Sequence, residues 1–202
     1  MKTSRRVHAL ATAAVAVFLG ATFTAPAQAY PPGQGVTIIG SQVHSLINES
    51  VIFTARHLRP GASVLIKLVG TTKGKTVEAN AQGVATVTLQ ADKTGTYAVI
   101  AKSKNETTAR TKLYVPEFSY ANGPAAAAGS TNTFIASELR PFVILTFRIN
   151  GTEYTQRVNS LGKVQIEFKM PMRKKVYNPP VFINSKWIGS GHETESLRIR
   201  SR

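Results

Sequence analysis

An eight-residue stretch that occurs twice constrains the fold of this chain more than any other feature. Phe53-Thr54-Ala55-Arg56-His57-Leu58-Arg59-Pro60 returns as Phe134-Ile135-Ala136-Ser137-Glu138-Leu139-Arg140-Pro141, with Phe, Ala, Leu, Arg and Pro in the same register at an offset of 134 − 53 = 81. A second pair of segments, Asn80-Ala81-Gln82-Gly83 and Asn159-Ser160-Leu161-Gly162, has an offset of 159 − 80 = 79. This period is too long for a solenoid repeat and long enough for a domain, so we expect two copies of one folding unit.

Short alternating segments between turn residues predict that each unit is built from β-strands. In the first copy the expected strands are residues 36–39, 50–55, 64–68, 76–79, 84–89, 97–101 and 109–115. The segment Leu58-Arg59-Pro60-Gly61 is typical of a type II turn, because Pro presets φ at the first turn position and Gly accepts a positive φ at the next. Seven short strands and no helix-length periodic run predict a small β-sandwich.

The second copy contains the clearest hairpin signal. Expected strands at 143–149 and 152–158 flank Asn150-Gly151, the strongest two-residue turn signal. This turn would place Phe147 opposite Tyr154 as an inward aromatic pair and Arg148 opposite Glu153 as an outward ion pair, each worth ~0.2–1 kcal/mol. The repeat also aligns the inward-facing residues of the two copies: Val64, Ile66 and Leu68 with Leu145, Phe147 and Ile149, and Ala85, Val87 and Leu89 with Val164, Ile166 and Phe168.

These turns resemble those of the bacterial immunoglobulin-like modules in secreted and surface proteins of Gram-positive, actinobacterial-type bacteria. In that family a strand leads into a Leu-x-Pro-Gly turn, and an Asp/Asn-x-x-Gly turn and a Gly-x-Tyr strand follow. The first copy has all three, the last as Gly95-Thr96-Tyr97, whereas the second has Phe142 in place of Gly and lacks Gly-x-Tyr. The resemblance implies an all-β chain of two tandem immunoglobulin-like β-sandwiches with a binding or spacer role and no catalytic residues.

The segment 1–29 has the pattern of a secretory signal peptide. Lys2, Arg5 and Arg6 precede an apolar run at 9–24, and Ala27-Gln28-Ala29 forms a small-x-small cleavage site before Tyr30. We therefore expect a signal peptide at 1–29, a first sandwich at 30–115, a linker or first strand at 116–130, and a second sandwich at 131–202. After cleavage we expect a secreted, monomeric protein without a transmembrane segment, which non-covalent contacts could retain at the cell surface.

The chain carries a strong excess of positive charge and no cysteine. Three of the 25 Lys and Arg residues and none of the 10 acidic residues precede Tyr30, so the remainder carries 22 − 10 = +12, shared as +6 on each side of Pro116. Such charge attracts polyanions and also promotes solubility. A solvated basic surface without a specific partner therefore stays open as the alternative. Without cysteine, each unit must be stabilised by burial alone.

The residues that usually carry catalysis are sparse and poorly spaced. After Ala29 the histidines are His44, His57 and His192, and Asp92 is the sole aspartate and lies in a turn signal. Glu193 and Glu195 lie two positions apart near the carboxyl end, where surface charges are the simpler interpretation. We therefore expect no enzymatic activity, no cofactor and no metal site.

The segment from Met170 to Trp187 departs from the repeat and places basic residues beside aromatic ones. Cations can contact phosphates while rings contact sugars or bases, which suggests a polyanion-binding loop. The alternative for this segment is a loop with solvated charges whose Trp187 covers the core. Arg198, Arg200 and Arg202 alternate with Leu197 and Ile199 and would form a basic stripe on one face of a last strand. The alternative for that stripe is that its charges protect an exposed edge. The candidate polyanion-binding residues are Arg173, Lys174, Lys175, Tyr177, Lys186, Trp187, Arg198, Arg200 and Arg202.

These features favour a secreted, non-catalytic binding or adhesion module of the cell envelope, held by charge to an anionic cell-wall or host polymer. A structural or accessory subunit that docks a protein partner through a sandwich edge is the first alternative, and a secreted enzyme with an unrecognised site is the least favoured. Salt separates the first two, because screening weakens exposed charge contacts and leaves strand pairing largely intact.

Overall fold

The computed structural model describes residues 35–104, 108–172, 176–177, 179–184, 186–189 and 197–200. These residues form β-strands and turns and contain no helix. Within the described part of the chain, therefore, no helix is present that could span a membrane.

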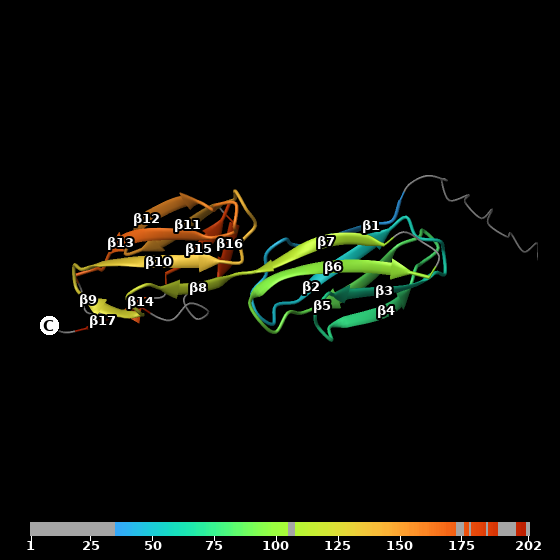
Figure 1. The fold of residues 1–202 in the computed structure, drawn as a ribbon, viewed down its shortest axis with the longest axis horizontal. Coiled ribbons are helices and arrows are strands. Elements are labelled where there is room, and N and C mark those ends of the chain that lie inside the picture. Colours follow the sequence, from blue (N-terminus) through green and yellow to red (C-terminus); the bar gives the residue numbers. More distant parts are fainter. Residues whose placement is uncertain are drawn as a thin grey trace, which may run out of the picture. The chain divides into compact units, whose positions relative to one another are not determined.

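The first seven strands form one β-sandwich (Figure 1). One sheet has the order β1-β2-β5 and the other the order β4-β3-β6-β7. The strands are β1 (Thr37–Gly40), β2 (Val51–Arg56), β3 (Ser63–Leu68), β4 (Gly74–Glu78), β5 (Ala85–Leu89), β6 (Gly95–Ser103) and β7 (Ala109–Val115). All seven strands expected from the sequence are present. The fourth strand pairs with the third, whereas in constant-type immunoglobulin domains it joins the sheet of the first, second and fifth.

The second sandwich repeats this strand order. Its sheets are β13-β10-β8 and β12-β11-β15-β16, which correspond strand for strand to the sheets of the first unit. The strands are β8 (Glu117–Tyr120), β10 (Thr131–Ser137), β11 (Ile144–Ile149), β12 (Thr152–Arg157), β13 (Val164–Lys169), β15 (Val181–Ile183) and β16 (Lys186–Gly189). Two tandem immunoglobulin-like sandwiches are thus present, as expected, and Pro116 alone separates β7 from β8.

A small third sheet joins segments from both ends of the second unit. Its order is β14-β17-β9, with β9 (Ala125–Ala127), β14 (Val176–Tyr177) and β17 (Leu197–Arg200). Strand β17 pairs with β9 in parallel and with β14 antiparallel. The interpretation of β17 as an exposed edge guarded by its arginines is therefore wrong, because the alanine run supplies a strand on one side of it and Val176–Tyr177 pairs on the other.

Each sandwich has its own core, and the repeat aligns the two. Phe53 and Phe134 are both fully buried and belong to separate hydrophobic clusters. Phe53 pairs with Val87 and Phe134 with Ile166, so the predicted equivalence of the two copies is confirmed. All the inward-facing residues aligned by the repeat are buried as well.

The predicted hairpin is also confirmed in its register. Phe147 lies opposite Tyr154, with ring centroids 6.3 Å apart, and Arg148 lies opposite Glu153 and forms an ion pair with it. The turn residues Asn150 and Gly151 have φ values of 49° and 81°. Positive φ at both central residues is what a type I′ turn requires.

The two repeated turn motifs contact each other in space. In the first unit Leu58 N–H donates to the carbonyl of Gly83 at 3.0 Å, and Leu139 N–H donates to Gly162 at 3.1 Å in the second. Within the Asn-x-x-Gly turns, the Asn80 and Asn159 side chains each accept hydrogen bonds from two backbone N–H groups. The repeat seen in the sequence is therefore a pair of turns that closes the same end of each sandwich.

Candidate functional site

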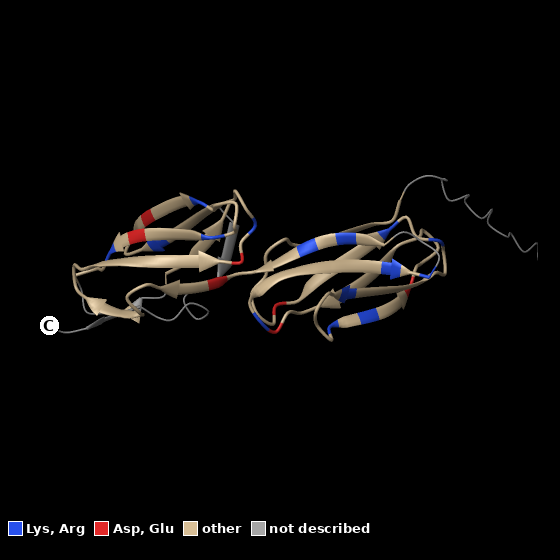
Figure 2. Cartoon of the chain, in the orientation of Figure 1, with Lys and Arg blue, Asp and Glu red and all other residues tan. Residues whose placement is uncertain are grey.

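Four cations lie on the outer face of the sheet β4-β3-β6-β7. Because Ile66 and Leu68 are buried, the alternation of the strand turns Lys67 outward. On β6 and β7 the same alternation around buried residues places further basic side chains on this side of the sheet. We call the four residues Lys67, Lys102, Arg110 and Lys112 the basic sheet face, and Figure 2 shows basic residues on these strands.

The strand register sets the spacing of these charges. Lys67 pairs with Ile100, and Ile100 pairs with Arg110, so Lys67 and Arg110 occupy one row with β6 between them. Strands lie about 4.8 Å apart, which separates the backbones of this pair by about 10 Å. Arg110 and Lys112 are two positions apart on β7, or about 7 Å. The basic sheet face therefore carries its cations at intervals comparable to those between charged groups of an extended polyanion.

None of the four cations has an ion pair within the part of the chain that the structure describes. The ion pairs found there join Lys73 to Asp92, at 3.7 Å, and Arg148 to Glu153. Among the strands of this sheet, the acidic residue on the outer side is Glu78, at the end of the edge strand β4 opposite Ser63. The Glu138 carboxylate also reaches this side, where it accepts a hydrogen bond from Thr96 of β6 at 2.8 Å. Unpaired cations within about one Debye length of each other create a positive potential that attracts an anionic partner.

Other outer faces of the two sandwiches differ from this one. Strands β1, β2 and β5 turn Ile39, Ile52 and several threonines outward, with Arg56 as the one charged residue among these described strands. In the second sandwich Arg148 pairs with Glu153 and also lies over the ring of Phe182 at 5.2 Å. The two halves of the chain therefore have equal net charge, but their charged residues are distributed differently over the outer sheet faces.

The residues predicted from the sequence fall in different parts of the second unit. Arg173, Lys174, Lys175 and Arg202 lie outside the described residues. For the other predicted residues, the structure gives the strand in which each one lies. Tyr177 is in β14 and pairs with Leu197, Lys186 and Trp187 are in β16, and Arg198 and Arg200 are in β17. Tyr177, Arg198 and Arg200 belong to the sheet β14-β17-β9, whereas Lys186 and Trp187 belong to the sheet β12-β11-β15-β16. The binding role of these residues stays a prediction.

Sequence reasoning missed the basic sheet face, although a signal for it was present. The alternation that assigned Ile66 and Leu68 to the core also assigns Lys67 to the opposite side. What the alternation does not reveal is that β3, β6 and β7 are neighbours, which brings the cations of three strands onto one surface.

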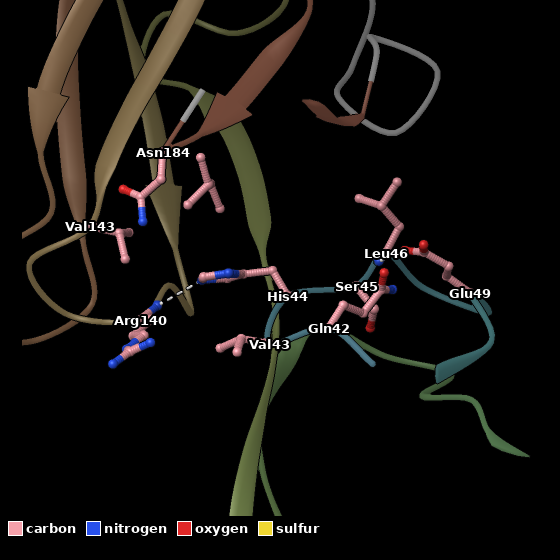
Figure 3. A pocket seen from close by; sticks show the side chains of 10 residues that line it. Gln42, Val43, His44, Ser45, Leu46, Glu49, Arg140, Val143 and Asn184 are labelled. Atoms are coloured by element: carbon pink, nitrogen blue, oxygen red, sulfur yellow. Dashed lines mark hydrogen bonds between the residues drawn. The ribbon is translucent and has the colours of Figure 1, made fainter. Parts of the chain in front are cut away.

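A pocket of about 560 Å³ is the second feature that could serve as a site (Figure 3). His44 lies in its wall, where its Nε2 accepts a hydrogen bond from the backbone N–H of Arg140 at 3.2 Å. The ring centroid of His44 is 5.5 Å from that of Tyr114. Burial, and then the positive charge of Arg140, lowers the pKa of His44 from 6.5 to about 4, so the imidazole is neutral at pH 7.

Two other polar side chains of this pocket, those of Glu49 and Asn184, form local hydrogen bonds. The Glu49 carboxylate accepts a hydrogen bond from Leu46 N–H at 2.7 Å, and Asn184 Oδ1 accepts one from Ile144 N–H at 2.9 Å. Across the described residues, no cluster of three or more His, Cys, Asp or Glu side chains could hold a metal ion. The pocket thus uses Glu49 and Asn184 for structure, whereas the buried hydroxyl of Ser45 has no hydrogen-bond partner among the described residues. The basic sheet face, which brings four cations together, is the stronger candidate site.

Comparisons with known proteins give the following similarities. No family model matches the chain, and no curated protein matches it. Solved structures to which it is similar include the D0-D1 domain of intimin, at 16% identity and TM-score 0.35 over 78% of this chain and 97% of that chain. A 282-residue carboxy-terminal fragment of intimin in complex with the intimin-binding domain of its receptor Tir has 12% identity and TM-score 0.44, over 76% and 61%. The adhesin InvE of Yersinia pseudotuberculosis has 14% identity and TM-score 0.32, over 82% and 59%. At these identities and TM-scores the similarities do not bear on function.

Proposed function

We propose that this chain is a secreted, non-catalytic binding module that attaches to the cell envelope by holding an anionic polymer on the basic sheet face. The observation that carries the proposal is the group of four cations that share one surface without an ion pair among the described residues. The secretory pattern of the segment 1–29 supports an extracellular setting.

The chemistry of the face favours recognition of charge over recognition of a particular sequence or sugar. Three of the four cations are lysines, which act as compact point charges, whereas arginine can form paired, directional hydrogen bonds. The outward neighbours of these cations on β3 and β6 are Leu65, Ala98 and Ile100, none of which offers an aromatic ring for stacking. The partner expected is therefore a flexible polymer with regularly spaced anionic groups, such as phosphates.

The test compares two variants of equal charge. In the first, Lys67, Lys102, Arg110 and Lys112 are all changed to Gln. In the control, four exposed cations elsewhere are changed to Gln: Arg56, Lys93, Lys163 and Lys169. Binding to long-chain polyphosphate and to isolated bacterial cell walls is measured from low to high salt, about 50 mM to 1 M. Melting temperatures of both variants should stay near that of the unmodified protein, because Lys67 is partly exposed, the other seven cations are exposed, and such charges contribute little to stability.

We expect the first variant to lose most of its binding and the control to keep most of it. Log affinity of the unmodified protein should fall with log salt with a slope of about −3 if all four cations contact anionic groups, by analogy with nucleic acids. Equal losses in the two variants would show that net charge alone matters and would reject the site. Association with cell walls that is insensitive to salt would reject charge-based attachment and favour docking of a protein partner.

A matching experiment tests the residues predicted from the sequence. Changing Arg173, Lys174 and Lys175 together to Gln should lower retention on cell walls if the loop takes part, without lowering the melting temperature. In the same assay Trp187→Ala should reduce binding if Trp187 contacts the polymer, and should reduce stability first if it covers the core. Unchanged retention in both would remove this loop from the proposed site.

A further inference from the structure

Strand β12 is an edge strand whose sequence is complementary to itself. It pairs with β11 on one side and is the end strand of the sheet β12-β11-β15-β16 (Figure 1). Tyr154 is partly buried and every other residue of the strand is exposed. An edge of this kind presents unpaired backbone N–H and C=O groups to any strand that can align with it.

The hairpin register shows which residues present those groups. In a two-residue hairpin the residues that close the turn, Ile149 and Thr152, bond to each other, and bonded and non-bonded pairs then alternate. Two observations agree with this order. Val158 N–H donates to Val143 at 2.9 Å, and the hydroxyls of Thr146 and Thr155 are 3.1 Å apart across a non-bonded pair. Glu153, Thr155 and Arg157 therefore direct their backbone groups away from β11.

We propose that a second copy of this chain pairs antiparallel with β12 about a twofold axis at Thr155. In this register Thr155 lies opposite Thr155 of the second copy, and Glu153 lies opposite Arg157 of the second copy, twice by symmetry. The three residues that direct their backbone groups outward are the ones that face each other, so they would form bonded pairs. A C2 contact requires such a self-complementary surface. The two four-stranded sheets would then form one continuous sheet.

The side chains of Glu153 and Arg157 are already held on the outer face of the sheet by contacts within one chain. Arg157 Nε donates to the carbonyl of Phe142 at 3.4 Å, and its guanidinium lies over the Phe142 ring at 5.3 Å. Glu153 is paired with Arg148, which in turn lies over the ring of Phe182. Each Glu153 in the dimer would therefore lie between Arg148 of its own chain and Arg157 of the second copy. Side chains that are ordered before association lose less conformational freedom when it occurs.

The equivalent edge strand of the first unit does not have this complementarity. Strand β4 carries Gly74, Thr76 and Glu78 where β12 carries Glu153, Thr155 and Arg157, at the same offset of 79 that relates the Asn-x-x-Gly turns. A twofold pairing about Thr76 would set Gly74 opposite Glu78 and bring no opposite charges together. Of these two edge strands, only β12 is therefore expected to pair with itself. Thr76 is a matched control for Thr155, since both residues are exposed.

A cysteine placed at the twofold axis tests the register. The chain contains no cysteine, so Thr155→Cys and Thr76→Cys each create a protein with one thiol. Residues opposite each other in a bonded antiparallel pair have Cα atoms about 5.5 Å apart, which is within the range a disulfide can bridge. With oxidised glutathione as oxidant, we expect Thr155→Cys to form covalent dimers at least tenfold faster than Thr76→Cys at the same low protein concentration. Equal rates for the two variants would overturn the register.

Charge reversal tests the partner. In Arg157→Glu, both opposed pairs would set glutamate against glutamate, and in Glu153→Arg both would set arginine against arginine. Each variant alone should be monomeric by sedimentation velocity at concentrations where the unmodified protein dimerises, and both should keep a folded melting transition. An equimolar mixture of the two variants sets glutamate against arginine at both opposed pairs of the mixed dimer, so it should restore dimerisation. The double variant Glu153→Arg with Arg157→Glu restores opposite charges at both pairs and should dimerise.

Three further outcomes would overturn the proposal. The first is a double variant that stays monomeric while it keeps its melting transition, since exchanging the two charges preserves every opposed pair. The second is an unmodified protein that is monomeric up to its solubility limit. Dimerisation of the single variants at the same concentration as the unmodified protein would equally exclude this register.

This interface does not use the basic sheet face, so the two proposals can fail separately. The sequence alone led us to expect a monomer, and the dimer proposed here departs from that expectation. Two basic sheet faces in one assembly would bind a long polymer more tightly than one, because the second contact becomes intramolecular. The single charge-reversal variants, measured in the polyphosphate assay beside the double variant, would show whether affinity changes together with oligomeric state.

Discussion

At the scale of single residues, the two glycines of the paired turns have the same backbone conformation and different surroundings. Gly61 has φ of 74° with open space where a Cβ would lie, whereas Gly83 has φ of 69° and its Cβ would come within 2.2 Å of the Leu58 carbonyl oxygen. Gly61→Ala should cost about 1 kcal/mol for the left-handed conformation alone. Gly83→Ala should cost about 2–4 kcal/mol, because it adds a steric clash that opens the contact between the turns. Urea unfolding of the two variants measures the difference.

The second unit supplies a control for this prediction. Gly151 has open space around its missing Cβ, while the Cβ of Gly162 would lie 2.4 Å from the Leu139 carbonyl oxygen. The same order of stability should therefore hold, with Gly162→Ala the more destabilising change. Equal costs for Gly61→Ala and Gly83→Ala would show that the contact between the turns does not support the sandwich.

At the scale of strands, β2 and β10 carry the aromatic residues around which each core is built. Phe53 is fully buried in the first core, and Phe134 stacks on Phe147 with ring centroids 4.5 Å apart in the second. Phe53→Ala should cost ~3–5 kcal/mol, a large share of the ~5–15 kcal/mol that stabilises a domain. The first unit should then melt at a much lower temperature in calorimetry while the transition of the second unit shifts little.

A surface position in the same sheet gives the comparison. Ile39 in β1 is 55% exposed, so Ile39→Ala should change the melting of the first unit only slightly. If Phe53→Ala instead made both units melt together at one lower temperature, the two sandwiches would not be independent folding units.

At the scale of the whole molecule, His44 makes stability depend on pH. Its Nε2 accepts a hydrogen bond from Arg140, a residue of the repeat turn in the second unit. The folded-state pKa of about 4 lies below the ordinary value of 6.5, because burial and the charge of Arg140 oppose protonation. The stability due to neutral His44 is therefore fully present above pH 6.5 and is lost as the pH falls from 6.5 to 4. Because the side chain is only partly buried, the loss should be on the order of 1–2 kcal/mol.

The variant His44→Gln isolates this effect. The amide oxygen of Gln can accept the same hydrogen bond from Arg140 N–H but does not titrate. Between neutral pH and about pH 4.5 the urea midpoint of the unmodified protein should fall further than that of the variant. Parallel losses in the two proteins would show that other groups cause the acid sensitivity.

The sequence by itself determined the features that depend on neighbouring residues along the chain. The internal repeat predicted two copies of one unit, and alternation predicted that Phe53, Ile66, Phe134 and Phe147 are buried. The Asn150-Gly151 turn predicted the register of its hairpin. Turn chemistry and side-chain alternation are local properties of a strand and its loop, so they can be read before any tertiary contact is known.

Only the tertiary structure decided which strands become neighbours. Lys67 and Arg110 share a face because β6 pairs with both β3 and β7, and β17 is not an edge because Ala125–Ala127 pairs with it. The edge position of β12 and the low pKa of His44 likewise depend on which segments pack beside them. Strand pairing between residues far apart in sequence depends on the burial of complementary faces in the whole domain, and that information is distributed over the chain instead of being carried by any one segment.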